Sequence, residues 1–226
     1  MWGDLERLRP GQIQAIRKRT PVAYLPWGAL EWHGRHNPVG LDGLIARAFS
    51  EALARETGGI VLPAVYAGTD TIKTLHPFGH TLEHAPGTVR TLCREFLEQL
   101  AQERYRVIVV VLGHVGGKHV KAVQEAAAVF SKKHRRVRVW AMPLPEPVEK
   151  TYRGDHAAVN ETSIQMHAHP GSVDLALLPR GRELTLERDG VWGEDPRKAT
   201  ASRGRRIRSA FLRNAVPRIR KLLASA

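Results

Sequence analysis

The sequence has a single cysteine, no long apolar run and no acidic residue in its last 30 positions, 197–226. Cys93 can form no disulfide within the chain, and thiolate metal sites are excluded, which fits a reducing cytoplasm. No apolar run approaches the roughly 20 residues of a membrane-spanning helix. Residues 1–6 lack the basic and apolar regions of a signal peptide. We therefore expect a cytoplasmic protein with no membrane segment.

The net charge of +13 is concentrated near the end of the chain. Residues 197–226 hold ten Lys or Arg, so the rest of the chain carries only +3. A basic helix can bind nucleic acid, but Phe211 is the only aromatic residue in this segment and base stacking has little support. We expect solvated charge or subunit packing here, and nucleic acid binding only if random DNA is retained in a salt-dependent way through residues 199–226.

Strand and helix patterns alternate along the 226 residues, a length that suits one α/β domain with a sizeable core. Apolar runs predict buried strands at 22–25, 60–62, 106–112 and 137–142. Helical spacing predicts helices at 10–18, 41–57, 89–104, 119–134, about 160–167 and 199–224. This order predicts a doubly wound, mainly parallel sheet. Residues 1–196 would form the domain, and residues 197–226 a basic helical segment packed on it or extending from it.

Four potential metal ligands follow the first predicted strand within twelve residues: Glu31, His33, His36 and Asp42. In an extended backbone, Glu31 and His33 point to the same side. Imidazole and carboxylate together suit Zn²⁺, Mn²⁺ or Fe²⁺. A long irregular stretch, 64–87, follows later and adds three histidines; loops of this length are usually functional or mobile.

Two further motifs each have an ordinary structural alternative. Residues 113–117, Gly-His-Val-Gly-Gly, follow the clearest predicted strand at the end where α/β sheets bind ligands. Taken alone, they also fit a tight turn with an incidental histidine. Residues 155–163 contain Asp155, His156 and Glu161, but a glutamate near a helix start is common because it favours the helix dipole.

Together these segments resemble the creatininase family of amidohydrolases over roughly residues 20–178. The matching pieces are Glu31-x-His33-Gly34-x-His36-x-Pro38 with Asp42, His84-x-Pro86-Gly87-Thr88, Gly113-His114-x-Gly116-Gly117, and His156-Ala157-x-x-x-Glu161-Thr162-Ser163. The resemblance implies a single-domain three-layer α/β/α fold and a hydrolase of a non-peptide or unusual C–N amide bond in a cyclic amide, formamide or small modified peptide. It also implies two divalent metal ions (Zn²⁺, Mn²⁺ or Fe²⁺) and a homo-hexamer.

The resemblance also assigns roles to individual residues. Glu31 and His114 would bind one metal and His33 the other, with Asp42 bridging the two and Glu161 completing the set. The expected catalytic residues are His156, the proton shuttle, with Asp155 and Glu161. The expected substrate-binding residues are His84, Lys118, Gly116 and Gly117, and the stretch 64–87 would border the substrate pocket.

The chain departs from the family pattern around its second motif. Leu112 precedes Gly113, Val115 replaces a glycine, and Lys118 replaces an asparagine. Gly116 stands where creatininase itself has a metal-binding glutamate, which argues against creatinine as the substrate and leaves Glu161 to do that work. A degenerate, non-catalytic member or a ligand-binding protein is the alternative, although all five expected ligand positions carry capable side chains.

Overall fold

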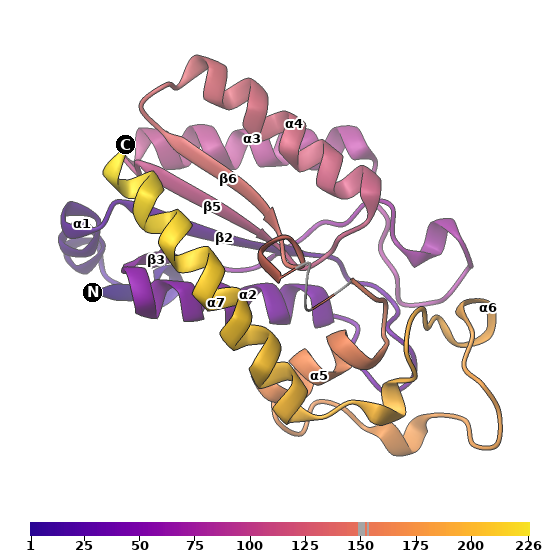
Figure 1. Ribbon diagram of the computed structural model, residues 1–226. Helices are drawn as coiled ribbons and strands as arrows, with labels where there is room; N and C mark the ends of the chain where they lie inside the picture. Colours follow the sequence, from indigo (N-terminus) through magenta and orange to yellow (C-terminus); the bar gives the residue numbers. More distant parts are fainter. Residues whose placement is uncertain (149–151, 153) are drawn as a thin grey trace.

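The computed structural model describes residues 1–148, 152 and 154–226, and six strands in this part of the chain form one sheet (Figure 1). The strands are β1 (Trp2–Asp4), β2 (Val22–Gly28), β3 (Gly59–Val61), β4 (Val65–Tyr66), β5 (Val107–Leu112) and β6 (Arg138–Pro143). Their order is β1-β3-β2-β5-β6, and every pairing is parallel. Strand β4 lies on the same side of β2 as β3 and pairs with the end of β2, past the residues that pair with β3. The central strands β2 and β5 are buried throughout, as their apolar runs predict.

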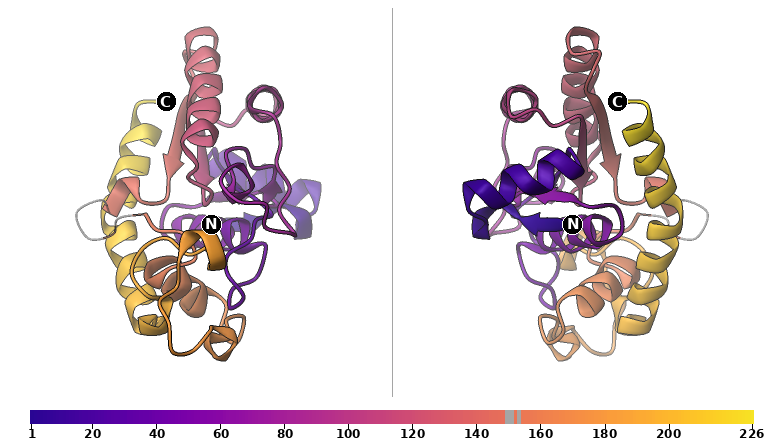
Figure 2. Two further views of the ribbon diagram at one scale, coloured as in Figure 1. Left: turned by 90° about the vertical axis from the view of Figure 1, so that its right-hand side faces the viewer. Right: turned by 90° about the vertical axis from the view of Figure 1, so that its left-hand side faces the viewer.

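Helices cover both faces of the sheet, giving three layers (Figure 2). The main helices are α1 (Pro10–Arg19), α2 (Leu41–Thr57), α3 (Pro86–Gln102), α4 (Gly117–Lys133), α5 (Val159–Ala168) and α7 (Ala201–Ala224). Successive residues of β5 point to opposite faces, so Val109 packs in the core under α2 and α7, whereas Val110 packs in the core under α1, α3 and α4. The predicted α/β/α fold with a parallel sheet is confirmed.

The basic helix α7 lies along one face of the sheet and contributes Phe211 and Ile219 to the core. It runs through Pro217, which is exposed. Near its start it approaches α5 so closely that a Cβ at Gly204 would lie 2.0 Å from the Ser163 carbonyl oxygen. Glycine at this position therefore allows α7 to support the helix that carries Glu161.

The short elements were not predicted. They are the strands β1 and β4, the helix α6 (Leu186–Asp189) and the 3₁₀ turns η1 (Leu5–Arg7), η2 (Ile72–Thr74), η3 (Glu146–Val148), η4 (Leu175–Leu177) and η5 (Pro196–Lys198). Strand β1 has three residues and no apolar run that would predict it; within the described part of the chain it is an edge strand that pairs with β3 alone. Cys93 is buried in α3. Among the described residues, no helix is both long and apolar enough to span a bilayer.

Candidate metal centre

Two junctions at the carboxyl edge of the sheet form the floor of the candidate site. The segment after β2 carries Glu31 and His33 and leads into α2, whose second residue is Asp42. His114 lies two residues beyond the end of β5. A Cβ at Gly113 would lie 2.0 Å from the Asp42 carbonyl oxygen, so glycine lets the two junctions meet. Strand order thus brings together side chains that are distant in sequence.

The first group of candidate ligands is Glu31, Asp42 and His114, all buried. Nδ1 of His114 lies 3.0 Å from Glu31 Oε2 and 3.2 Å from Asp42 Oδ2. One ligand atom from each residue lies within 4.8 Å of those of the other two, so one cation can reach all three.

The second group is His33, Asp42 and Glu161, also buried. Nε2 of His33 lies 3.1 Å from Asp42 Oδ1 and 3.8 Å from Glu161 Oε2. Glu161 is the third residue of α5, where Ala157 N donates a hydrogen bond of 2.8 Å to its Oε2. Asp42 therefore belongs to both groups and presents a different carboxylate oxygen to each.

Backbone carbonyls orient both imidazoles. Nδ1 of His33 lies 3.0 Å from the Glu31 carbonyl oxygen, and Nε2 of His114 lies 3.0 Å from the Thr69 carbonyl oxygen. Because a carbonyl only accepts, these nitrogens carry the proton in the neutral rings. The lone pairs of His33 Nε2 and His114 Nδ1 then face the carboxylates, as metal ligation requires.

The donor atoms of this cluster fit divalent cations. With the imidazole protons directed to backbone carbonyls, Glu31 Oε2, Asp42 Oδ2 and His33 Nε2 are buried and face lone pairs without a hydrogen-bond partner among the described residues, a costly state unless a ligand completes them. Burial lowers the pKa of His33, but the charge of Asp42, a hydrogen bond to it and the charge of Glu161 outweigh burial and raise this pKa to about 10, so in the absence of a cation His33 binds a second proton at the position where a metal would bind. The site thus favours positive charge. Its three carboxylates and two imidazoles match the ligands of Zn²⁺, Mn²⁺ and Fe²⁺.

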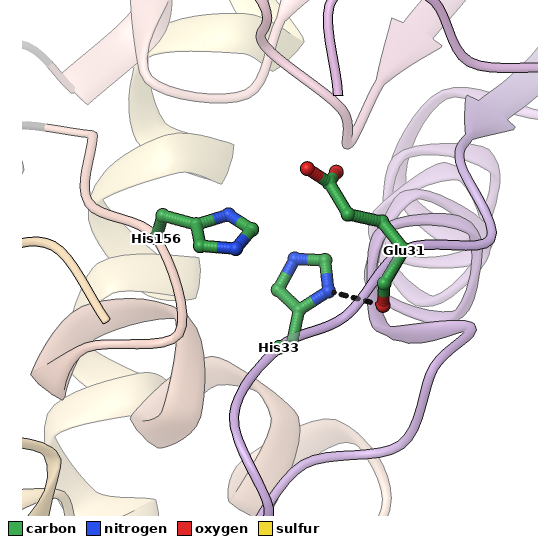
Figure 3. A group of neighbouring side chains, drawn as sticks. All are labelled: Glu31, His33 and His156. Atoms are coloured by element: carbon green, nitrogen blue, oxygen red, sulfur yellow. Dashed lines mark hydrogen bonds between the residues drawn. The ribbon is translucent and has the colours of Figure 1, made fainter. Parts of the chain in front are cut away.

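His156 reaches the same cluster from the loop before α5. Figure 3 shows its ring beside that of His33, with the Glu31 carboxylate near both, and the three residues form a further group that could reach one cation. Its ring centroid lies 4.4 Å from that of His33, and its Nε2 lies 2.9 Å from the Trp32 carbonyl oxygen. Burial and the neighbouring His33 lower the pKa of His156 to about 4, so its ring is neutral at pH 7.

Asp155, an expected catalytic residue, is engaged at the start of α5. Asn160 N donates to its Oδ2 at 2.7 Å, and Glu161 N donates to its Oδ1 at 3.1 Å. Both oxygens thus hold the backbone that presents Glu161. Burial raises the pKa of Asp155 to about 6, although these hydrogen bonds oppose the shift.

A cavity of about 500 Å³ opens onto both ligand groups. Beyond the candidate ligands, its lining comes from four chain segments and includes Asp70, Thr71, Ile72, Leu75, Val115, Gly116, Gly154, Asp155, His156, Leu186 and Trp192. Leu75 and Trp192 are 63% and 59% exposed, so the cavity has an apolar rim. The family resemblance predicted that the 64–87 stretch borders the pocket. Residues 186 and 192 were not predicted, because they lie in a segment with no motif.

The expected substrate-binding residues divide into two sets. Gly116 lines the cavity, and Gly117 begins α4 beside it. Lys118 and His84 are not among the lining residues: the Lys118 side chain is 70% exposed with Nζ 3.8 Å from Asp70 Oδ1, and His84 Nδ1 lies 3.3 Å from the Gly68 carbonyl oxygen. His36, first considered with the ligands, instead has Nε2 3.1 Å from Thr162 Oγ1.

Comparisons with known proteins bear on this centre. The family profile described as creatininase, creatinine amidohydrolase, matches residues 6–219. The mycofactocin precursor peptide peptidase of Mycolicibacterium smegmatis is 28% identical over 233 residues, covering 91% of this chain and 87% of the relative. The creatinine amidohydrolase of Pseudomonas putida is 26% identical over 203 residues, covering 80% and 76%.

Solved structures share the fold. A creatinine amidohydrolase (creatininase) crystal structure superposes with a TM-score of 0.81 at 20% identity, covering 97% of each chain. A mutant creatininase of the Zn-Zn type gives a TM-score of 0.77 at 21% identity, covering 99% of each chain.

Proposed function

Because the chain belongs to the creatininase family of C–N hydrolases, we propose that it cleaves an amide bond of a small peptide or modified peptide, using two divalent ions. The observation that carries this proposal is that the Asp42 carboxylate belongs to two ligand groups. One oxygen lies in the group with Glu31 and His114, and the other lies in the group with His33 and Glu161. When bound there, two divalent ions lower the pKa of water towards neutrality and polarise the carbonyl under attack.

The residues around the two groups supply the remaining chemistry. Because Nε2 of His156 donates to the Trp32 carbonyl, Nδ1 is the ring atom that can take a proton from water and pass it to the leaving nitrogen. A neutral ring at pH 7 suits the first of these transfers. Asp155 holds the backbone amides of Asn160 and Glu161 and thereby fixes Glu161 in the second ligand group.

Two features favour a peptide over creatinine. A Cβ at Gly116 would lie 2.5 Å from the Asp70 carbonyl oxygen and 2.9 Å from His114 Nε2, so the glutamate that creatininase carries there cannot be accommodated. The cavity of about 500 Å³, with Leu75 and Trp192 at its rim, is large for a single small ring and offers apolar contacts to side chains. The similarity to precursor peptide peptidases points the same way.

The test is a substrate comparison on protein stripped with chelator and reloaded with Zn²⁺, Mn²⁺ or Fe²⁺. Creatinine, formamides and short peptides are incubated with each form, and products are identified by mass spectrometry. We expect peptide cleavage that disappears on stripping and returns with metal. Faster turnover of creatinine than of any peptide, or cleavage that persists without metal, would contradict the proposal.

We also propose that the protein is a homo-hexamer and lies in the cytoplasm. The family resemblance implies a homo-hexamer, which sedimentation of the purified protein measures directly. A cytoplasmic location fits the single buried cysteine, and fractionation of the source cell checks it.

A further inference from the structure

The Glu83 carboxylate, which lies outside the candidate ligand set, holds the segment 69–71 with four hydrogen bonds. Its Oε1 accepts from Asp70 N at 2.7 Å and from Thr69 Oγ1 at 3.3 Å. Its Oε2 accepts from Thr71 N at 3.0 Å and from Thr71 Oγ1. Hydrogen bonds to a charged acceptor are roughly twice as strong as neutral ones, so this contact fixes the segment firmly.

The segment needs such support because its turn is unusual. Asp70 has φ of +63°, a left-handed conformation that is uncommon for residues other than glycine and that Asp adopts when local hydrogen bonds support it. Its Oδ2 accepts from Lys118 N at 2.9 Å, which ties the turn to the start of α4. Glu83 and Lys118 therefore hold Asp70 from two sides.

The ends of this turn contact two candidate metal ligands. The Thr69 carbonyl oxygen lies 3.0 Å from His114 Nε2 and so fixes the ring that presents Nδ1 to the site. Ile72 N donates to Glu31 Oε1, leaving Oε2 to face His114. Glu31 and His114 belong to the first ligand group, whereas the turn's hydrogen bonds within the described chain do not extend to His33 or Glu161, the partners of Asp42 in the second.

We propose that Glu83 is a positioning residue for the first ligand group alone: by holding the 69–72 turn, it sets the orientations of His114 and Glu31. This inference rests on the proposed two-metal function. The second group takes none of its own hydrogen bonds from the turn: the backbone carbonyl of Glu31, rather than the carboxylate that Ile72 N contacts, holds His33, and Ala157 N holds Glu161. Loss of the Glu83 contacts should therefore weaken one metal position and spare the other.

The experiment measures metal binding directly. Chelator-stripped wild type and Glu83→Gln are titrated with Zn²⁺ against a fluorescent chelator, and with Co²⁺ by visible absorption. The amide of Gln places N–H donors against the backbone donors of the turn. We expect two equivalents in wild type, and in the variant a roughly 10-fold weaker Kd for one equivalent, the lower end of the range for residues that contact a metal ligand directly, because Glu83 acts through the turn. The second Kd should stay within about twofold.

A milder variant and a matched control separate positioning from folding. Thr71→Val removes one donor to Glu83 while nearly keeping shape, and it should weaken the same single position by a smaller factor. Glu98→Gln makes the same chemical change on α3, where Glu98 pairs with Lys133 and His134, and it should change neither Kd.

Three results would overturn the inference. The first is unchanged Kd values in both Glu83→Gln and Thr71→Val. The second is equal weakening of both positions together with a lower unfolding midpoint of the metal-free protein, which would indicate a general structural role. The third is a wild type that binds no divalent ion. This result would refute the proposed function itself, and it is distinguished from the other two because it is seen without any variant.

Discussion

Nδ1 of His114 lies 3.2 Å from Oδ2 of Asp42, although the two residues belong to different strand–helix junctions. The other oxygen of the same carboxylate lies 3.1 Å from Nε2 of His33. One buried aspartate thus meets two imidazoles, each of which offers the nitrogen that the backbone leaves free. This shared carboxylate is the structural basis for the proposed two-ion site.

Asp42→Asn should weaken both metal positions, because a neutral amide replaces the only carboxylate common to the two groups. We expect a loss of affinity of at least ~100-fold, the upper end of what removal of an outer partner causes. Metal content after gel filtration, measured by elemental analysis, checks this. Asp174→Asn, which changes a cap of η4, is the matched control. Full metal content in Asp42→Asn would contradict the bridging role.

His156→Gln should lower kcat by about 10²- to 10⁴-fold, the contribution of a positioned proton carrier, while leaving metal content unchanged. Steady-state kinetics and elemental analysis on the same preparation check both parts. Because His156 also lies within reach of a cation shared with Glu31 and His33 (Figure 3), loss of one metal equivalent would instead identify it as a ligand.

Leu75→Ser should raise KM for a peptide substrate by roughly three- to tenfold with little change in kcat, since it removes apolar contact area at the rim and no reacting group. Initial rates over a range of peptide concentrations measure the split. A fall in kcat at constant KM would show that this side chain does not act through binding. Val129→Ser makes a comparable change at an exposed position of α4, away from the cavity, and should alter neither constant.

His36 should make the fold sensitive to acid. Burial, with a smaller effect from His33, lowers its pKa from 6.5 to about 4. Between these values the unfolded chain binds a proton that the folded chain does not, so stability is full above about pH 6.5 and falls as pH falls towards 4. The loss at pH 4.5 is about 2 kcal/mol.

Urea unfolding of wild type and His36→Gln at pH 7 and pH 4.5 tests this effect. The variant should lose about 2 kcal/mol less than wild type between the two pH values, whatever its stability at pH 7. Equal losses in the two proteins would show that His36 does not titrate between folded and unfolded states as its burial and contact with Thr162 indicate.

The parallel sheet and its covering helices could be predicted from sequence, because burial on both faces leaves unbroken apolar runs in β2 and β5. The positions of Glu31, His33, Asp42 and His114 near the carboxyl edge followed from the strand ends. Their assignment to two ions came from the family resemblance, since spacing alone could not tell a ligand from an incidental histidine.

The turn at residues 69–72 could not be predicted, because its function depends on backbone atoms. The Thr69 carbonyl and the Ile72 amide exist in any sequence, and only the fold directs them to His114 and Glu31. Likewise, Trp192 reaches the cavity through a two-residue bridge to His156, a pairing that leaves no periodic pattern. Lys118 and His84 were selected from the motif positions, and their side chains lie outside the cavity lining.

The most direct measurement is anomalous diffraction from crystals of the metal-loaded protein, recorded above and below the absorption edge of the added metal. The two-ion account predicts two anomalous peaks on either side of the Asp42 carboxylate, one shared with Glu31 and His114 and the other with His33 and Glu161. A single peak that leaves either group without metal, or peaks only elsewhere on the molecule, would contradict it.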